Sequence, residues 1–296
     1  MIANDKFTLY VYDGDYGLPS LNVECTKTLL FFLIAKVPVQ IKTLNNLKLC
    51  MFHSGSYFVH KNVCLKSFHE SVLYLNTLNY NLDMNLSPKQ RSESLALKTL
   101  VQAKLRTVLE YVLWLEHRNC EEFTQLWYAK ALPFPFNNIL IKRLKENALD
   151  LIESQYSSDY YSLETIKDNI TMLVTECLSS LSARLSNLNY FYGDSPTSLD
   201  IIVYSYLAPL MKLPFPSNSI NSLVALWPNL VNFVKRIDVK YLPDLPKEPK
   251  YIKNEDKTKT SDDEVSYVAI SILTISAVTL MFGFAMSKGF ISTKLY

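Results

Sequence analysis

The chain has 296 residues, 49% of them apolar, which is enough for two modest domains or one large one with a full core. A formal net charge of +2, with no Lys/Arg block interleaved with aromatic residues, argues against a nucleic-acid partner. The five cysteines form no CxxC pair, the amino terminus carries no secretory signal, and the four histidines lack zinc spacing. We therefore expect reduced thiols in a cytosol-facing protein, and no bound metal.

The amino-terminal part predicts an α/β unit. Phe7, Leu9 and Val11 alternate with other residues, which is the period-2 pattern of a strand. An apolar run over 23–35 has the length of a helix, and 37–44 returns to β-branched residues. Strand, helix and strand in this order predict a crossover between two parallel strands.

A hairpin and a helix are expected next. The short runs 56–60 and 63–66 are separated by two residues and predict paired strands. The stretch 67–78 predicts a helix, because Ser67 and Glu70 have the spacing of a capping box.

Beyond these elements the pattern becomes helical. Ser87, Pro88 and Gln90 combine an N-cap, a first-turn proline and a capping-box partner. The helix that they begin carries one apolar stripe, made of Leu97, Val101, Leu105, Val108, Val112 and Leu115.

Two further helices are predicted near the end of this region. Thr197 and Asp200 have capping spacing ahead of an apolar stretch, so we expect them to act in structure and not in chemistry. Pro228 begins another helix, whose buried face is expected to hold Leu230, Phe233, Val234 and Ile237.

The last part of the chain predicts a tether and a membrane anchor. Residues 243–264 combine prolines with dense mixed charge and favour a flexible spacer. Residues 265–287 hold no charge, and as a helix they reach roughly 34 Å, enough for a hydrocarbon core of about 30 Å. The alternative is a buried helix of a soluble core. The anchor interpretation assigns to the bilayer Val265, Tyr267, Phe282, Phe284 and Ser287.

Several motifs carry a resemblance to a known family. They are "GLPS" at 17–20, "WYAKALPFPFN" at 127–137 and "YFYGDSPTSLDIIVYSYLA" at 190–208. Together with the element order, they resemble the metaxin family, specifically its tail-anchored first type, within the glutathione-transferase-like superfamily. The most specific of the three is 127–137, because ordinary glutathione transferases lack it.

The resemblance implies a fold and a domain plan. The expected fold is a thioredoxin-like α/β domain at 1–82 and an all-helical glutathione-transferase-type domain at 83–242. A flexible tether at 243–264 and a transmembrane tail anchor at 265–287 complete the plan.

The resemblance also implies a function without catalysis or cofactor. Metaxins belong to the sorting and assembly machinery that inserts β-barrel proteins into the mitochondrial outer membrane. The implied partners are a second metaxin, the barrel-forming subunit and outer-membrane lipid, with the body in the cytosol. Motor adaptors that couple mitochondria to transport are a further implied partner.

A membrane-anchored glutathione-dependent transferase is the alternative. Transferases need a cis-proline before the third strand, and the expected position holds Phe58, where a cis bond would cost about 3 kcal/mol. Glu70 and Ser71 match the acidic-Ser pair that holds the γ-glutamyl group, although helix capping is the favoured explanation for them. Tyr10 or Tyr12 could stabilise a thiolate, although ordinary strand packing explains both.

Four aromatic residues pose a separate question. Trp127, Tyr128, Phe134 and Phe136 are expected in a proline-flanked connection between helices. They form either a rigid partner-binding knob or an interior plug, since interfaces and cores both favour aromatic residues.

Overall fold

The computed structural model describes residues 6–44, 55–132, 134, 136–155, 163–245, 248–250 and 281. The chain separates into two compact units, Met1–Lys253 and Asn254–Tyr296. The first unit, called the body below, contains every element that follows.

The body begins with a sheet and two helices. In chain order these elements are β1 (Phe7–Val11), α1 (Val23–Ile34), β2 (Val39–Thr43), β3 (Tyr57–His60), β4 (Val63–Leu65) and α3 (Phe68–Thr77).

Helical elements follow to the end of the body. They are α4 (Pro88–Glu110), η1 (Tyr111–Leu115), α5 (His117–Asn119), η2 (Cys120–Thr124), α6 (Gln125–Ala131), α7 (Phe136–Gln155), α8 (Leu163–Leu185), α9 (Ser198–Lys212), α10 (Ser219–Val224) and α11 (Pro228–Tyr241).

The four strands form one mixed sheet in the order β2-β1-β3-β4. β1 pairs with β2 in parallel, as the strand-helix-strand pattern predicts, with Phe7 opposite Val39. β3 and β4 are antiparallel, which confirms the predicted hairpin. Lys61 in the connecting turn adopts the left-handed region at φ 52°.

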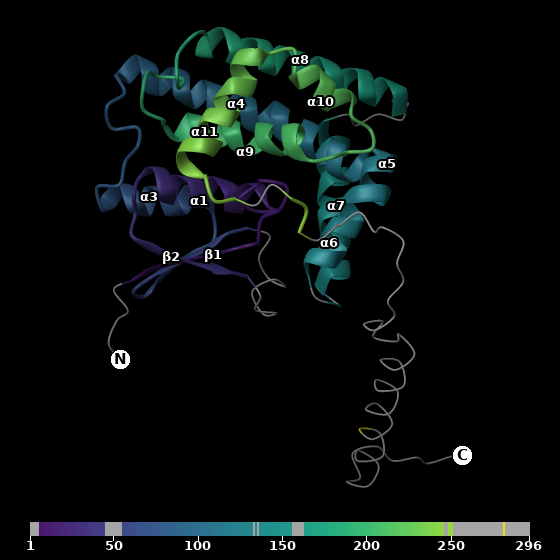
Figure 1. Cartoon of the computed structure of the whole chain (residues 1–296), viewed down its shortest axis with the longest axis horizontal. Helices are drawn as coiled ribbons and strands as arrows, with labels where there is room; N and C mark the ends of the chain where they lie inside the picture. The colour runs from purple at the N-terminus through teal and green to yellow at the C-terminus, as the bar shows by residue number, and fades with distance from the viewer. Residues whose placement is uncertain are drawn as a thin grey trace. The chain divides into compact units, whose positions relative to one another are not determined.

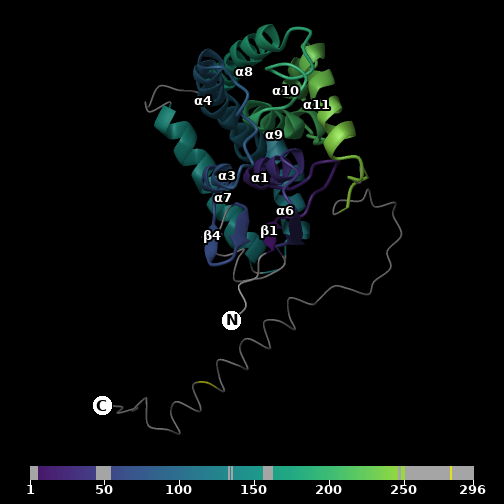
Figure 2. The ribbon, with the colours of Figure 1, turned by 90° about the vertical axis from the view of Figure 1, so that its left-hand side faces the viewer.

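Helix α1 links the sheet to the helices beyond it. It packs against β1 and α3 and also against α9, so it lies between the two parts of the body (Figure 1). Viewed after a 90° turn, α4 and α8 lie farther from the sheet than α1 does (Figure 2). Contacts between α1 and α9 therefore join the α/β elements to the helical elements.

Helix α9 lies at the centre of the helical part. Every residue from Ser198 to Leu210 is buried, on all faces of the helix. A helix that is apolar all round belongs inside a core. α4 and α11 both pack on α9. Val101, Leu105 and Val108 of the predicted α4 stripe are buried, as is the whole predicted face of α11.

The predicted stripe of α4 ends differently from expectation. The helix widens into the π-helical turn η1, in which the Glu116 N–H donates to the Tyr111 carbonyl at 2.9 Å. The four consecutive residues Tyr111–Trp114 are buried. A single apolar stripe on a regular helix could not bury four consecutive side chains. The η1 turn is therefore surrounded by other elements on several sides.

Lys250, in the segment expected to be a tether, contacts the loop between β1 and α1. The Lys250 backbone N–H donates to Asp15 Oδ1 at 2.7 Å, and the Lys250 ammonium pairs with Asp13. Both aspartates belong to the loop between β1 and α1. Gly14 between them permits the loop's close turn, because a Cβ there would lie 2.2 Å from the Leu18 carbonyl oxygen.

Candidate functional site

The residues of the transferase alternative do not line the main cavity described below. Tyr12 is 3% exposed, directly after β1. The Ser71 hydroxyl donates to the Ser67 carbonyl at 2.8 Å. The Glu70 carboxylate accepts from the Lys66 N–H at 3.2 Å, so only half of the predicted capping box with Ser67 is formed. The Glu70 carboxylate binds the N–H of the residue before the N-cap and not that of the N-cap itself.

The expected proline position was wrong by two residues. Phe58 lies inside β3, opposite Leu9, and is fully buried against Phe32. The residue before the third strand is Ser56, whose hydroxyl lies 2.8 Å from that of Thr28. Because this residue is also not a proline and Ser71 is bonded internally, these residues do not fit glutathione in the way that a transferase holds it.

Cys25 lies at the start of α1, near the end of β1. It is fully buried, and burial raises the pKa of its thiol to about 12. A thiol with this pKa stays protonated at neutral pH and is a poor nucleophile.

The aromatic residues at 127–136 divide into two pairs. Trp127 and Tyr128 belong to α6 and not to a connection, which corrects the expectation, and both are buried. Phe134 is 54% exposed between α6 and α7, and Phe136 is partly buried at the start of α7. The expectation of an interior plug is thus met by Trp127 and Tyr128. Phe134 is the one residue of the four that is exposed.

Trp127 and Tyr128 fix the loop between β1 and α1. The Trp127 indole N–H donates to Asp15 Oδ2 at 2.8 Å, and the Tyr128 hydroxyl donates to the Leu21 carbonyl at 3.1 Å. Asp15 is 1% exposed and also accepts from the Tyr16 N–H. These contacts hold the helical part against the loop that precedes α1.

Asp200 organises the start of α9. Its carboxylate accepts from the Thr197 N–H and hydroxyl, both at 2.7 Å, and from the Phe191 N–H at 3.0 Å. Burial raises its pKa to about 6, although these three donors act in the opposite direction. All three contacts are internal to the fold.

The residues assigned to the membrane anchor lie outside the described part of the chain. These are Val265, Tyr267, Phe282, Phe284 and Ser287. Among the residues that the structure does describe, no helix is both long and apolar enough to cross a bilayer.

A cavity of about 420 Å³ lies where α1 faces the helical part of the body. Its apolar lining includes Leu21, Leu109, Leu113 and Leu144. Its aromatic lining consists of Trp114, Tyr128 and Tyr206. Its charged lining consists of Glu24, Lys27, Arg106 and Glu110. A volume of this size with a mixed lining is typical of small-ligand sites. We call it the central cavity.

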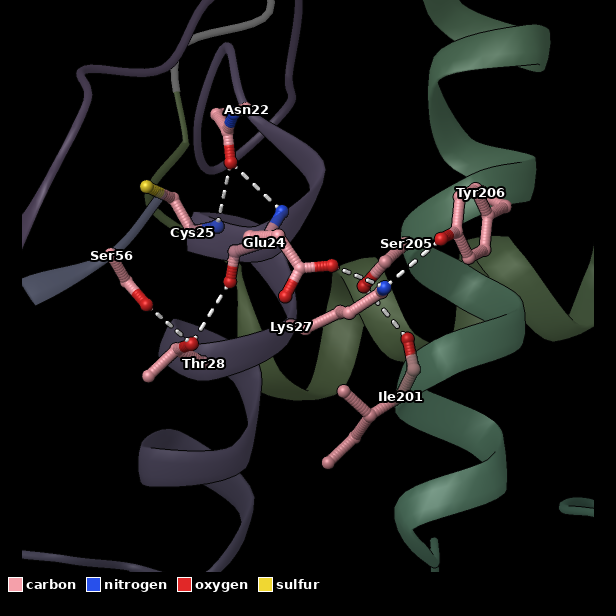
Figure 3. Close-up of polar contacts among 9 residues, drawn as sticks. All are labelled: Asn22, Glu24, Cys25, Lys27, Thr28, Ser56, Ile201, Ser205 and Tyr206. Atoms are coloured by element: carbon pink, nitrogen blue, oxygen red, sulfur yellow. Dashed lines mark hydrogen bonds and ion pairs between the residues drawn. The ribbon is translucent and has the colours of Figure 1, made fainter. Parts of the chain in front are cut away.

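Lys27 lines the central cavity, and its side chain extends from α1 towards Tyr206 on α9 (Figure 3). Its side chain is 2% exposed, and its ammonium lies 2.6 Å from Glu24 Oε1 and 3.0 Å from the Tyr206 hydroxyl. Burial alone would lower the pKa of Lys27, but Glu24 and Tyr206 together raise it above the usual value. The ammonium therefore stays charged inside the body.

The first turn of α1 is fixed by side chains in the same region. Asn22 is the N-cap, and its Oδ1 accepts from the Glu24 and Cys25 N–H groups at 2.9 and 3.1 Å (Figure 3). The Thr28 hydroxyl donates to the Glu24 carbonyl at 2.9 Å. This turn holds the carboxylate of Glu24 at the rim of the cavity.

Glu110 and Arg106 line the opposite wall from successive turns of α4. Burial raises the pKa of Glu110 to about 7, and the Arg106 charge partly opposes this shift. Arg106 itself is exposed. Among the described residues, no hydrogen bond or ion pair reaches the Glu110 carboxyl.

Sequence reasoning missed the central cavity. A signal existed for Lys27, because a lysine within an apolar helical run, three residues after a glutamate, is unusual. The partner Tyr206 lies 179 residues away in sequence, and no local pattern connects the two.

Comparisons with known proteins agree with this architecture. Residues 25–145 match the Tom37 family, described as an outer mitochondrial membrane transport complex protein. Residues 174–237 match the glutathione S-transferase C-terminal domain. A glutathione S-transferase of Ceriporiopsis subvermispora, solved in complex with glutathione, superimposes with a TM-score of 0.54 at 11% identity. The superposition covers 81% of this chain and 100% of that one. The fold is thus that of the glutathione-transferase class.

Sequence relatives narrow this class to one family. Metaxin-1 of Macaca fascicularis is 27% identical over 97% of this chain and 91% of its own length. The Metaxin-1 homolog of Drosophila melanogaster is 31% identical over 77% of this chain and 71% of its own length. The chain belongs to the metaxin family.

Proposed function

We propose that this protein is a non-enzymatic subunit of the sorting and assembly machinery of the mitochondrial outer membrane. Its proposed function is to assist the insertion and assembly of β-barrel proteins. The observation that carries the proposal is membership of the metaxin family, together with the match of residues 25–145 to an outer-membrane transport complex family. The body then contributes binding surfaces and no chemistry.

The geometry of the expected glutathione positions supports the non-enzymatic part of the proposal. Ser56 occupies the place of the proline, and its hydroxyl contacts Thr28. The hydroxyl of Ser71 and the carboxylate of Glu70 contact backbone groups of their own helix start. These groups serve the fold, and Cys25 is a protonated thiol at neutral pH.

The proposed arrangement in the cell has a body in the cytosol and a single anchor at 265–287. The proposed partners are a second metaxin, the barrel-forming subunit of the machinery and outer-membrane lipid. The anchor would raise the effective concentration of the body near the barrel-forming subunit. Phe134, which is 54% exposed, is a candidate for a partner contact.

The test follows newly imported porin, an outer-membrane β-barrel protein, in mitochondria depleted of this chain. We expect porin to stall before its mature assembly on native gels, while import of a matrix protein proceeds normally. Re-expression of the full chain should restore assembly. Normal porin assembly after depletion would rule out the proposed job and leave the fold and family unchanged.

The glutathione-transferase alternative rests on one observation, the fold shared with a transferase solved in complex with glutathione. Its test is retention of the protein on immobilised glutathione. Retention that is lost in Glu70→Ala would support a glutathione site and contradict the non-enzymatic proposal. We expect no retention.

A further inference from the structure

Among the described residues, no hydrogen bond or ion pair reaches one carboxyl of the central cavity, that of Glu110. Glu24 and Lys27 neutralise each other at 2.6 Å, and Tyr206 completes the coordination of the ammonium. Arg106 lies one turn before Glu110 on α4 and attracts its carboxylate electrostatically, although its side chain is exposed and forms no ion pair with Glu110 in the described structure. Glu110 is the remaining ionisable carboxyl, and no hydrogen bond or ion pair reaches it from the described residues. Glu110 is only half-buried and lines the cavity, so its carboxyl is open to a donor or a cation that enters the space beside it.

The rest of the lining defines the chemistry of such an occupant. Trp114 and Tyr128 supply aromatic faces, which attract cations electrostatically, whereas the Lys27 ammonium already lies 4.5 Å from the centre of the Tyr206 ring. The leucine side chains of the lining suit an apolar stem. The volume of about 420 Å³ is sufficient for one long side chain or a small organic cation.

We propose that the central cavity binds a cationic group carried on an apolar stem, such as an arginine or lysine side chain, with Glu110 as the counter-ion. This inference goes beyond the proposed role in barrel assembly and does not depend on it. It assigns the metaxin body a ligand site at the junction of α1 with the helical elements.

The titration of Glu110 is expected to set the pH dependence of binding, because the other charged groups of the lining keep their charge near neutral pH. The titratable and charged groups of the lining are Glu24, Lys27, Arg106, Tyr128 and Tyr206. Lys27 is held charged by Glu24, and burial raises the pKa of Tyr128 far above neutral pH. Glu110, with a pKa of about 7, is therefore the group that changes charge near neutral pH.

The experiment uses the full chain in lipid nanodiscs, with empty nanodiscs as the blank. Ligand-observed NMR titrations measure the affinity of n-butylguanidinium, n-pentanoate and 1-pentanol, which share a similar stem and differ in charge. We expect the guanidinium to bind more tightly than the other two. Its affinity should rise about tenfold from pH 6 to pH 8, because Glu110 ionises in this interval while the guanidinium stays charged.

Three variants separate the site from the fold. Glu110→Gln should weaken n-butylguanidinium binding at least tenfold and abolish its pH dependence. Arg106→Gln should move the pH dependence of binding to higher pH, because Arg106 favours the ionised form of Glu110. Glu153→Gln, which changes an exposed carboxylate on α7 outside the cavity lining, should leave it unchanged. If Glu110→Gln does not fold, the pH titration of the unaltered chain still decides the question.

Several outcomes would overturn the proposal. They are preferred binding of n-pentanoate, equal binding by Glu110→Gln, pH-independent binding, or no binding of any probe at 10 mM. An acetylated, amidated Leu-Arg-Leu peptide then identifies the source of the cation. Tighter binding of the peptide than of n-butylguanidinium indicates a side chain of a partner protein, and weaker binding indicates a free small cation. Either result supports the site.

Discussion

The buried ammonium of Lys27 depends on a carboxylate that is itself partly in solvent. The Lys27 side chain is 2% exposed, whereas that of Glu24 is 43% exposed. Water can replace Lys27 around Glu24, but it cannot replace Glu24 around Lys27. The two partners therefore contribute unequally to stability.

We expect Glu24→Gln to lower the free energy of unfolding by about 2 kcal/mol, because it leaves a buried cation without its counter-ion. Lys27→Met should cost less than about 1 kcal/mol, since an apolar chain of similar length fills the space. Urea denaturation followed by circular dichroism measures both. A larger loss in Lys27→Met than in Glu24→Gln would contradict the unequal role of the two residues.

Glu110 should make the stability of the fold depend on pH. Its carboxyl has an ordinary pKa of 4.5 when unfolded and a pKa of about 7 in the folded chain, because burial disfavours its charge. The folded state thus binds more protons between these values, and the contribution of Glu110 to stability falls as pH rises from about 4.5 to about 7. It is constant above that range.

The comparison of Glu110→Gln with the unaltered chain isolates this contribution. We expect the variant to gain stability relative to the unaltered chain as pH rises from 5 to 8, measured by urea denaturation at each pH. Glu153→Gln, on the exposed side of α7, serves as the control and should show no such trend. A stability difference that does not change with pH would show that Glu110 ionises normally in the folded chain.

Helix α9 shows how one polar cluster can fix the start of a central helix. Asp200 is fully buried and serves three donors, two from Thr197 and one from Phe191. Since the helix is buried on all faces, water cannot reach these donors if the carboxylate is removed. The capping residues therefore affect the packing of the whole helical part.

Replacement of Asp200 by Ala should lower the free energy of unfolding by about 3 kcal/mol, because it leaves buried N–H groups without acceptors. Asp194→Ala nearby, at an exposed position, should cost less than about 0.5 kcal/mol. Urea denaturation of both variants provides the comparison. Similar losses for the two would mean that the cluster does not stabilise α9.

The whole molecule joins a folded body to a segment expected to hold it in the membrane. The body's own described contacts reach to Lys250, whose backbone N–H donates to Asp15. The part of the expected tether that would separate the body from the anchor therefore begins after this residue and not at 243.

Truncation after Asp263 tests the anchor independently of barrel assembly. We expect the shortened chain to appear in the cytosolic fraction with unchanged circular dichroism, because every described element of the body precedes the cut. The full chain should remain with mitochondria. Retention of the shortened chain on mitochondria would mean that partner contacts, and not the segment 265–287, hold the body there.

Local patterns in the sequence predicted the elements well where one physical rule dominates. The period-2 alternation around Leu9, the capping box at Ser87 and the proline start at Pro228 each correspond to an element in the structure. The same rules failed where position along the chain had to be counted across a turn. The proline position was expected at Phe58, two residues after Ser56, which precedes β3, and Trp127 was expected in a connection and lies in α6.

The sequence by itself determined the strand-helix-strand, hairpin and helix order of the amino-terminal part, the starts of α4, α9 and α11, the metaxin resemblance, and the apolar stretch 265–287, because these follow from spacing between near neighbours. Only the tertiary structure decided that Lys27 pairs with Tyr206, that Trp127 bonds Asp15, and that Glu110 faces a cavity without a partner. These contacts join residues from distant parts of the chain. Burial and the resulting pKa shifts depend on which elements pack together, and no local sequence pattern contains that information.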